Sequence, residues 1–150
     1  MNDDPHDLAR FVAAQAGSYT AALLELQAGR KASHWMWYVF PQAEALGHSA
    51  MSRRYAIRSL DEACAYLDHP LLGARLRECT HALLAHPQRS AREIMGTPDD
   101  LKLLSSMTLF AAVPGADPVF ARVLDVFFAG RPDPRTLDWL GRHGGATPPG

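Results

Sequence analysis

The chain of 150 residues is poor in several features that define large classes of proteins. Its two cysteines, Cys64 and Cys79, lack the spacing of a redox motif, so we expect reduced and mostly buried thiols in a cytoplasmic protein. No apolar run approaches the roughly 20 residues that span a bilayer, and the acidic N-terminus is unlike a signal peptide. We therefore expect no contact with membranes.

Net charge is also small. At −1, it gives nucleic acid no long-range attraction. Arg53, Arg54 and Arg58 form a short basic cluster, which on a nearly neutral chain predicts a solvated face. We therefore do not expect nucleic acid as a partner.

The familiar catalytic motifs are missing as well. The chain has no G-x-S-x-G, Walker loop, G-x-G-x-x-G or H-E-x-x-H pattern. Glu78 and His81 form a single E-x-x-H pair, whereas di-iron bundles need that pair twice with two further glutamates. We expect no metal and no cofactor.

Helix punctuation, in contrast, is abundant. Prolines preceded by Asp, Thr or His open several apolar-periodic runs, as proline does at first helical positions. Ser59 and Ser90 are each followed three residues later by Glu, the pattern of a capping box. Gly29, Gly96 and Gly130 follow periodic segments, where a left-handed residue ends a helix.

Strand signals are weak, so this pattern predicts an all-α fold. We expect one compact multihelical domain of about eight short helices over residues 5–141. The last residues, 142–150, show no periodicity and are predicted to form a disordered C-terminal tail.

The most unusual stretch is "HWMWYVFPQ", residues 34–42. On a helix its apolar side chains would surround the axis, as in a helix buried on most sides. Buried indole N–H groups nevertheless need partners, and Lys31 and His34 lie one turn upstream. Because Trp35 and Trp37 are two positions apart, they cannot face the same neighbours on a helix. We predict that one indole packs into the core and that the other borders a pocket with Lys31, His34 and Gln42, with Lys102 as the candidate for the opposite wall.

A second stretch also places polar residues within an otherwise apolar segment. "DDLKLLSSMTLF", residues 99–110, is apolar nearly all round and reads as a central helix. It also carries Lys102, Ser105, Ser106 and Thr108, and a buried lysine is rare unless it is paired. Lys102 is either a lysine that reaches the surface or the floor of a polar pocket, with Asp99 as its local partner.

Four motifs together resemble a known family. "HWMWYVFPQ", "LGHSAMSRRYAI" (46–57), "YLDHPLLGARL" (66–76) and "DDLKLLSSMTLF" occur in the order of a bacterial domain of unknown function, number 1810 in its series. The resemblance spans about residues 8–140 and implies a single all-α domain with no established activity. Some relatives carry a calpastatin label, but that inhibitor is long and disordered, unlike this chain. The positions that match the family signature are Lys31, His34, Trp35, Trp37, Phe40, Pro41, Gln42, Gly47, Ser49, Ser52, Tyr55, Lys102, Ser105 and Thr108.

Two functional interpretations remain open. In the first, the domain binds a small nucleotide-like or ADP-ribose-like anion, through an indole face, cations and hydrogen-bonding groups, with His34 as the candidate for proton transfer. In the second, it is a non-enzymatic helical interaction module. The candidate ligand-binding residues are Lys31, His34, Trp35, Trp37, Gln42, Ser49, Tyr55 and Lys102.

Overall fold

The computed structural model describes residues 3–143, and this part of the chain folds into ten helices without a β-sheet. The all-α prediction is confirmed. The helix count exceeds the expected eight partly because a helix as short as α4, with five residues, shows no helical period. The helices are α1 (Ala9–Gln15), α2 (Tyr19–Gln27), α3 (Met36–Val39), α4 (Ala50–Arg54), α5 (Leu60–Asp68), α6 (Leu72–Leu84), α7 (Ala91–Met95), α8 (Asp99–Ala111), α9 (Val119–Phe128) and α10 (Pro134–His143).

The last helix extends beyond the predicted domain boundary. α10 continues to His143, two residues beyond position 141. The rest of the predicted tail, 144–150, lies outside the described residues.

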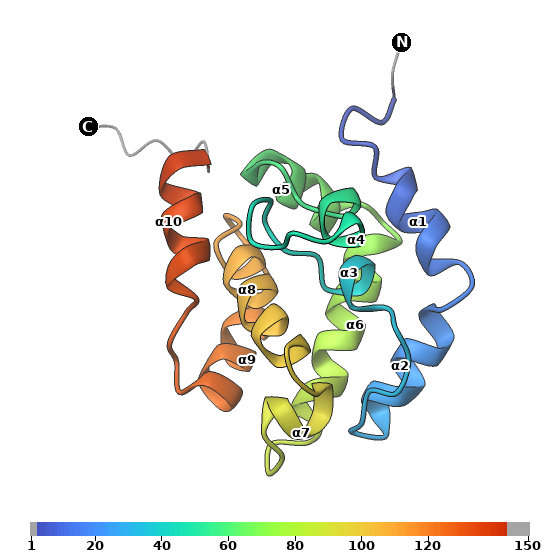
Figure 1. Cartoon of the computed structure of the whole chain (residues 1–150), viewed down its shortest axis with the longest axis vertical. Coiled ribbons are helices and arrows are strands. Elements are labelled where there is room, and N and C mark those ends of the chain that lie inside the picture. Colours follow the sequence, from blue (N-terminus) through green and yellow to red (C-terminus); the bar gives the residue numbers. More distant parts are fainter. Residues whose placement is uncertain (1–2, 144–150) are drawn as a thin grey trace.

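Two long helices, α6 and α8, form the centre of the fold (Figure 1). α8 packs against α5, α7, α9 and α10, and α6 packs against α2, α5 and α9. Seven residues of α8 are buried, including Met107 and Phe110, so the sequence prediction of a central helix is confirmed. No helix in the described part of the chain is both long and apolar enough to cross a bilayer.

The predicted helix punctuation is largely confirmed. Ser90 forms a complete capping box with Glu93, and Gly29, Gly96 and Gly130 all have φ between 73° and 78°. Ser59 accepts a hydrogen bond from the Glu62 N–H at 3.0 Å. The Glu62 carboxylate, however, does not return to Ser59 but accepts from the Arg58 N–H at 3.1 Å. The Glu62 carboxylate instead contacts a residue that is distant in sequence.

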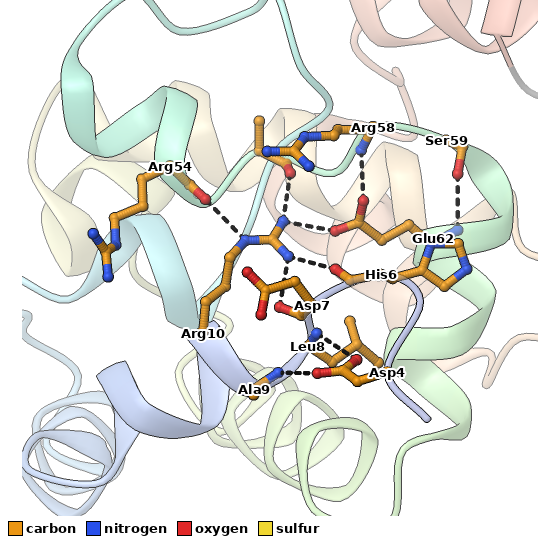
Figure 2. A network of polar contacts seen from close by, with 11 residues as sticks. Asp4, His6, Asp7, Leu8, Ala9, Arg10, Arg54, Arg58, Ser59 and Glu62 are labelled. Carbon is orange, nitrogen blue, oxygen red and sulfur yellow. Dashed lines mark hydrogen bonds and ion pairs between the residues drawn. The ribbon is translucent and has the colours of Figure 1, made fainter. Parts of the chain in front are cut away.

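That contact is a buried ion pair with Arg10 of α1. Arg10 Nη2 lies 2.7 Å from Glu62 Oε2, and the two side chains are only 7% and 3% exposed. The other N–H groups of Arg10 donate to four carbonyl oxygens, those of His6, Asp7, Arg54 and Ala56, at 2.7–2.8 Å (Figure 2). All five donors of the guanidinium are therefore used.

This network joins three parts of the chain that are distant in sequence. Arg10 holds the turn before α1, the end of α4 with the residues after it, and the first turn of α5. A guanidinium so fully hydrogen-bonded recovers the cost of its own burial, whereas its loss would leave several buried acceptors unpaired.

The two cysteines are free. Cys79 is buried as predicted, and burial raises the pKa of its thiol to about 12. Cys64 is partly exposed, which differs from the expectation of a mostly buried side chain; burial, together with Asp61 and Asp68, also raises the pKa of its thiol. Both shifts disfavour the reactive thiolate.

The Arg10–Glu62 pair generates a stability prediction. Glu62→Gln leaves Arg10 as a buried charge without its counter-ion, and such a loss costs about 3 kcal/mol or more. Urea unfolding followed by far-UV circular dichroism should show this loss in the free energy of unfolding.

The matched control is an exposed pair. Arg142 and Asp138 on α10 lie 2.7 Å apart with side chains 67% and 66% exposed, so Asp138→Asn should cost less than about 1 kcal/mol. Equal effects of the two substitutions would show that the buried network does not stabilise the fold.

Candidate functional site

The aromatic stretch is only partly helical. α3 covers Met36 to Val39; Trp35 precedes it with φ −136°, and Phe40 follows it with φ −126° and ψ 72°. Pro41 has no N–H and disfavours helical geometry at the residue before it, so the helix ends there. The expectation that one helix carries the stretch as far as Gln42 is corrected: Gln42 lies on extended chain.

Trp35 belongs to the core. It is fully buried, and its indole Nε1–H donates to Glu25 Oε1 at 2.9 Å. The Lys31 ammonium lies 4.9 Å from the ring centroid and pairs with Asp99 at 2.8 Å. The polar groups around this indole thus find partners within the protein.

Glu25 of α2 organises the loop that leads to Trp35. Its carboxylate accepts from the N–H groups of Ala32 and Ser33, from the Ser33 hydroxyl and from the Trp35 indole, at 2.6–2.9 Å. Partial burial acts to raise the pKa of Glu25, but these hydrogen bonds outweigh it and lower the pKa to about 2. The sequence pattern did not single out Glu25.

Trp37, in the first turn of α3, has a different environment from Trp35. It is half-buried and lines a pocket. The Lys102 ammonium lies 5.5 Å from its ring centroid, within the range of a cation–π contact. Lys102 also faces Asp99, with Nζ 3.8 Å from Oδ1. Each indole of the stretch therefore meets one lysine, and Asp99 lies between the two lysines.

The chain after Pro41 forms one wall of this pocket. Ile57 N–H donates to the Gln42 carbonyl at 2.8 Å, and Glu44 N–H donates to the Ile57 carbonyl at 2.9 Å, which makes a short parallel pairing. In extended chain, alternate side chains point to the same side. Ala43 is buried, whereas Gln42 and Glu44 are partly exposed and both line the pocket.

We call this cavity the Trp37 pocket. It has a volume of about 320 Å³, at the lower end of typical small-molecule sites. Its polar groups include an amide, a carboxylate, an imidazole, a guanidinium and two hydroxyls. The lining residues are Trp37, Gln42, Ala43, Glu44, Ala45, Gly47, His48, Ser52, Arg53, Tyr55 and Ala56.

A smaller hollow adjoins it, with Gln42 and Gly47 as shared walls. This Lys102 hollow has a volume of about 160 Å³, and its other lining residues are Leu46, Pro98, Leu101, Lys102 and Arg135. Two cations, Lys102 and Arg135, thus border the hollow beside the Trp37 pocket, which itself contains His48 and Arg53.

Several polar groups of the pocket have no protein partner. Within residues 3–143, no hydrogen bond or ion pair engages the Gln42 amide, the Glu44 carboxylate or the Tyr55 hydroxyl. The Tyr55 ring is 7% exposed, and its centroid lies 5.8 Å from that of Phe11 and 5.4 Å from that of Tyr38. The core therefore fixes the ring while its hydroxyl stays available for a ligand.

Ser49 and Gly47 both act on Ser52, a lining residue of the pocket. Ser49 caps α4 by accepting from the Ser52 N–H at 3.1 Å, and its hydroxyl donates to Ser52 Oγ at 3.0 Å. A Cβ at Gly47 would come within 2.5 Å of Ser52 Cβ, so a side chain at this position would displace Ser52.

The structure thus separates the predicted site residues into two groups. Trp37, Gln42 and Tyr55 line the Trp37 pocket, and Lys102 lines the adjoining hollow. The other four lie apart from both cavities: Lys31 and Trp35 pack on the inner side, His34 is exposed, and Ser49 serves as a helix cap.

The unexpected hydroxyls of α8 have a structural role. Ser105 donates to Asp133 Oδ2 at 2.9 Å, and Thr108 Oγ1 accepts from the Asp133 N–H at 2.9 Å. Thr136 also donates to Asp133 Oδ2, at 2.6 Å. Asp133 thereby joins the start of α10 to α8, so these side chains hold two helices together instead of lining a pocket.

A larger hollow beside α1 suits an anionic ligand less well. Its volume is about 550 Å³, and the carboxylates of Asp3 and Asp4 line it together with two histidines and mostly apolar side chains. Among the described residues, no group of three His, Cys, Asp or Glu side chains could hold a metal ion. The Trp37 pocket is therefore the candidate site.

Comparison with known proteins identifies relatives without a known role. A family model described as "Protein of unknown function (DUF1810)" matches residues 5–140. The chain is 53% identical to the conserved hypothetical protein Rv1873 from Mycobacterium tuberculosis, whose crystal structure was determined at 1.38 Å. The match covers 91% of this chain and 97% of that one, with a TM-score of 0.89. No curated protein matches the chain.

The Glu25 hydrogen bonds generate a pH prediction. Because folding lowers the Glu25 pKa from 4.5 to about 2, the carboxylate stabilises the fold above pH 4.5, and this contribution is lost as pH falls toward 2. Glu25→Gln should therefore be less stable than wild type at pH 7, with the difference shrinking as pH falls through this window. Urea unfolding at several pH values measures it; a difference independent of pH would refute the assignment.

Proposed function

The chain belongs to the DUF1810 family, whose function is unknown, and from the geometry of its own side chains we propose that it binds a small nucleotide-like anion in the Trp37 pocket. The observation that carries the proposal is the Trp37 indole, which lines a pocket together with polar groups that have no partner in the described chain.

The aromatic face supports a planar ligand. Base–aromatic stacking is worth about 1–3 kcal/mol, and it accepts any base because each has a π-face. Trp37 is half-buried, and its backbone is fixed in α3. A preorganised stacking surface loses little entropy when a ligand binds.

The charges support an anion. Arg53 lines the pocket itself, and Lys102 and Arg135 border the hollow beyond Gln42 and Gly47. At 3.8 Å, the Lys102–Asp99 contact is long for an ion pair, so Lys102 can turn to a phosphate at modest cost. A base on Trp37 with its phosphate toward the hollow would use both cavities.

Size favours a mononucleotide over a larger ligand. A cavity of about 320 Å³ with a hollow of about 160 Å³ suits one nucleoside monophosphate better than ADP-ribose. A general base needs a hydrogen-bond path to the group that it deprotonates. Because His34 lies apart from this pocket, we propose binding without assigning a reaction.

A second candidate is a protein-interaction role. It is favoured by two large exposed apolar side chains on neighbouring helices, Leu101 of α8 and Leu137 of α10, which are 59% and 47% exposed. Such a role predicts a partner that covers these leucines and no binding of small anions.

The test is calorimetric titration of the protein with nucleoside 5′-monophosphates at low salt. Trp37→Ala should weaken binding roughly tenfold or more through loss of stacking, and Trp37→Phe should retain part of it. Lys102→Gln should weaken binding several-fold and reduce its salt dependence.

The matched control is Arg122→Gln, which removes an exposed cation of α9 that lies outside these cavities. It should leave affinity unchanged, and circular dichroism should show that all variants are folded. Binding that survives Trp37→Ala at full strength, or no binding of any nucleotide to wild type, would exclude this function.

A further inference from the structure

The Trp37 pocket contains a carboxylate that a purely anionic ligand does not explain. Glu44 lies among cations and next to the proposed stacking surface, yet no group within residues 3–143 hydrogen-bonds or pairs with it. Leaving a partly buried carboxylate without donors costs binding free energy. A ligand that fits this pocket must therefore carry donors for Glu44 as well as negative charge.

Gln42 and Glu44 lie in a defined arrangement. Both backbones are tied to Ile57, at 2.8 and 2.9 Å, and the buried Ala43 lies between them. Their side chains lie on either side of the buried Ala43 in sequence, and both line the Trp37 pocket. Together they present an amide, which can donate, beside a carboxylate, which accepts at two oxygens.

We infer that Gln42 and Glu44 read the edge of a guanine base stacked on Trp37, which makes the preferred ligand a guanine nucleotide. This inference rests on the proposed function. Among the common bases, only guanine presents two adjacent donors, N1–H and the N2 amine, beside a carbonyl acceptor. The two donors match the carboxylate of Glu44, and the O6 acceptor matches the amide of Gln42.

Other bases satisfy this pair less well. Adenine offers one exocyclic donor beside a ring acceptor, so one carboxylate oxygen would remain without a partner. Sites that hydrogen-bond a specific ligand group reject analogues without it strongly, because their own polar groups are then left unpaired. The carboxylate thus supplies selectivity, whereas the indole and the cations supply affinity.

The experiment compares GMP, IMP, dGMP and AMP by calorimetric titration of the full chain. IMP differs from GMP only by the missing N2 amine. GMP and dGMP should bind equally, and each should bind at least tenfold more tightly than IMP or AMP. Glu44→Gln should reduce the ratio of the affinities for GMP and IMP to less than threefold. The affinity for AMP should change little or improve.

The control is Asp138→Asn, which removes a carboxylate of α10. Asp138 and Glu44 both line a different hollow, but Asp138 does not line the Trp37 pocket. It should preserve the GMP-to-IMP ratio. If GMP, IMP and AMP bind equally to wild type, or if the ratio survives Glu44→Gln, the inference is overturned while nucleotide binding stands. If dGMP binds much more weakly than GMP, Glu44 reads the ribose hydroxyls instead, which also overturns it. If none of the four binds, the proposed function fails first.

Discussion

The buried guanidinium of Arg10 is the interaction on which the geometry of the pocket depends. Its Nη2 donates both to Glu62 Oε2 and to the carbonyl of Ala56, and Ala56 lines the Trp37 pocket. Its Nε donates to the carbonyl of Arg54, the last residue of α4 (Figure 2). One side chain of α1 therefore fixes the back wall of a pocket formed mainly by residues 42–56. A wall held by charge-assisted hydrogen bonds is rigid before a ligand arrives, which reduces the entropy lost on binding.

Much of the fold could be predicted from the sequence because its determinants are local. Caps such as Ser90 and helix ends such as Gly96 depend on residues a few positions away. The central position of α8 followed from its apolar composition. α4 could not be predicted, because its five residues are fewer than the pattern that reveals a helix. The early end of the aromatic helix was foreseeable from Pro41, whose effect on Phe40 is steric and local.

The site was predicted only in part, for a physical reason. Trp35 packs inward and Trp37 lines a pocket with Gln42, but Lys31 and His34, expected at the same pocket, lie apart from it. The two indoles are separated by a helix terminus rather than by rotation on one helix. Which polar residues join Trp37 depends on tertiary contacts. Glu44 enters the pocket through the pairing of its backbone with Ile57, a contact across 13 positions that no sequence motif marks. In the sequence, Lys31 and Lys102 looked equivalent. After folding, Lys31 pairs with Asp99 beside the buried Trp35, whereas Lys102 lines the hollow next to the Trp37 pocket.

The central claim is that the Trp37 pocket is a preformed nucleotide site with Glu44 as its selective group. The most direct measurement is a crystal structure of the protein grown with GMP. The expected result is a guanine ring stacked on Trp37, with N1 and N2 within hydrogen-bond distance of Glu44 and the phosphate toward Lys102, and with the Arg10–Glu62 pair unchanged. An empty Trp37 pocket at saturating GMP, or a nucleotide bound elsewhere on the surface, would contradict the claim.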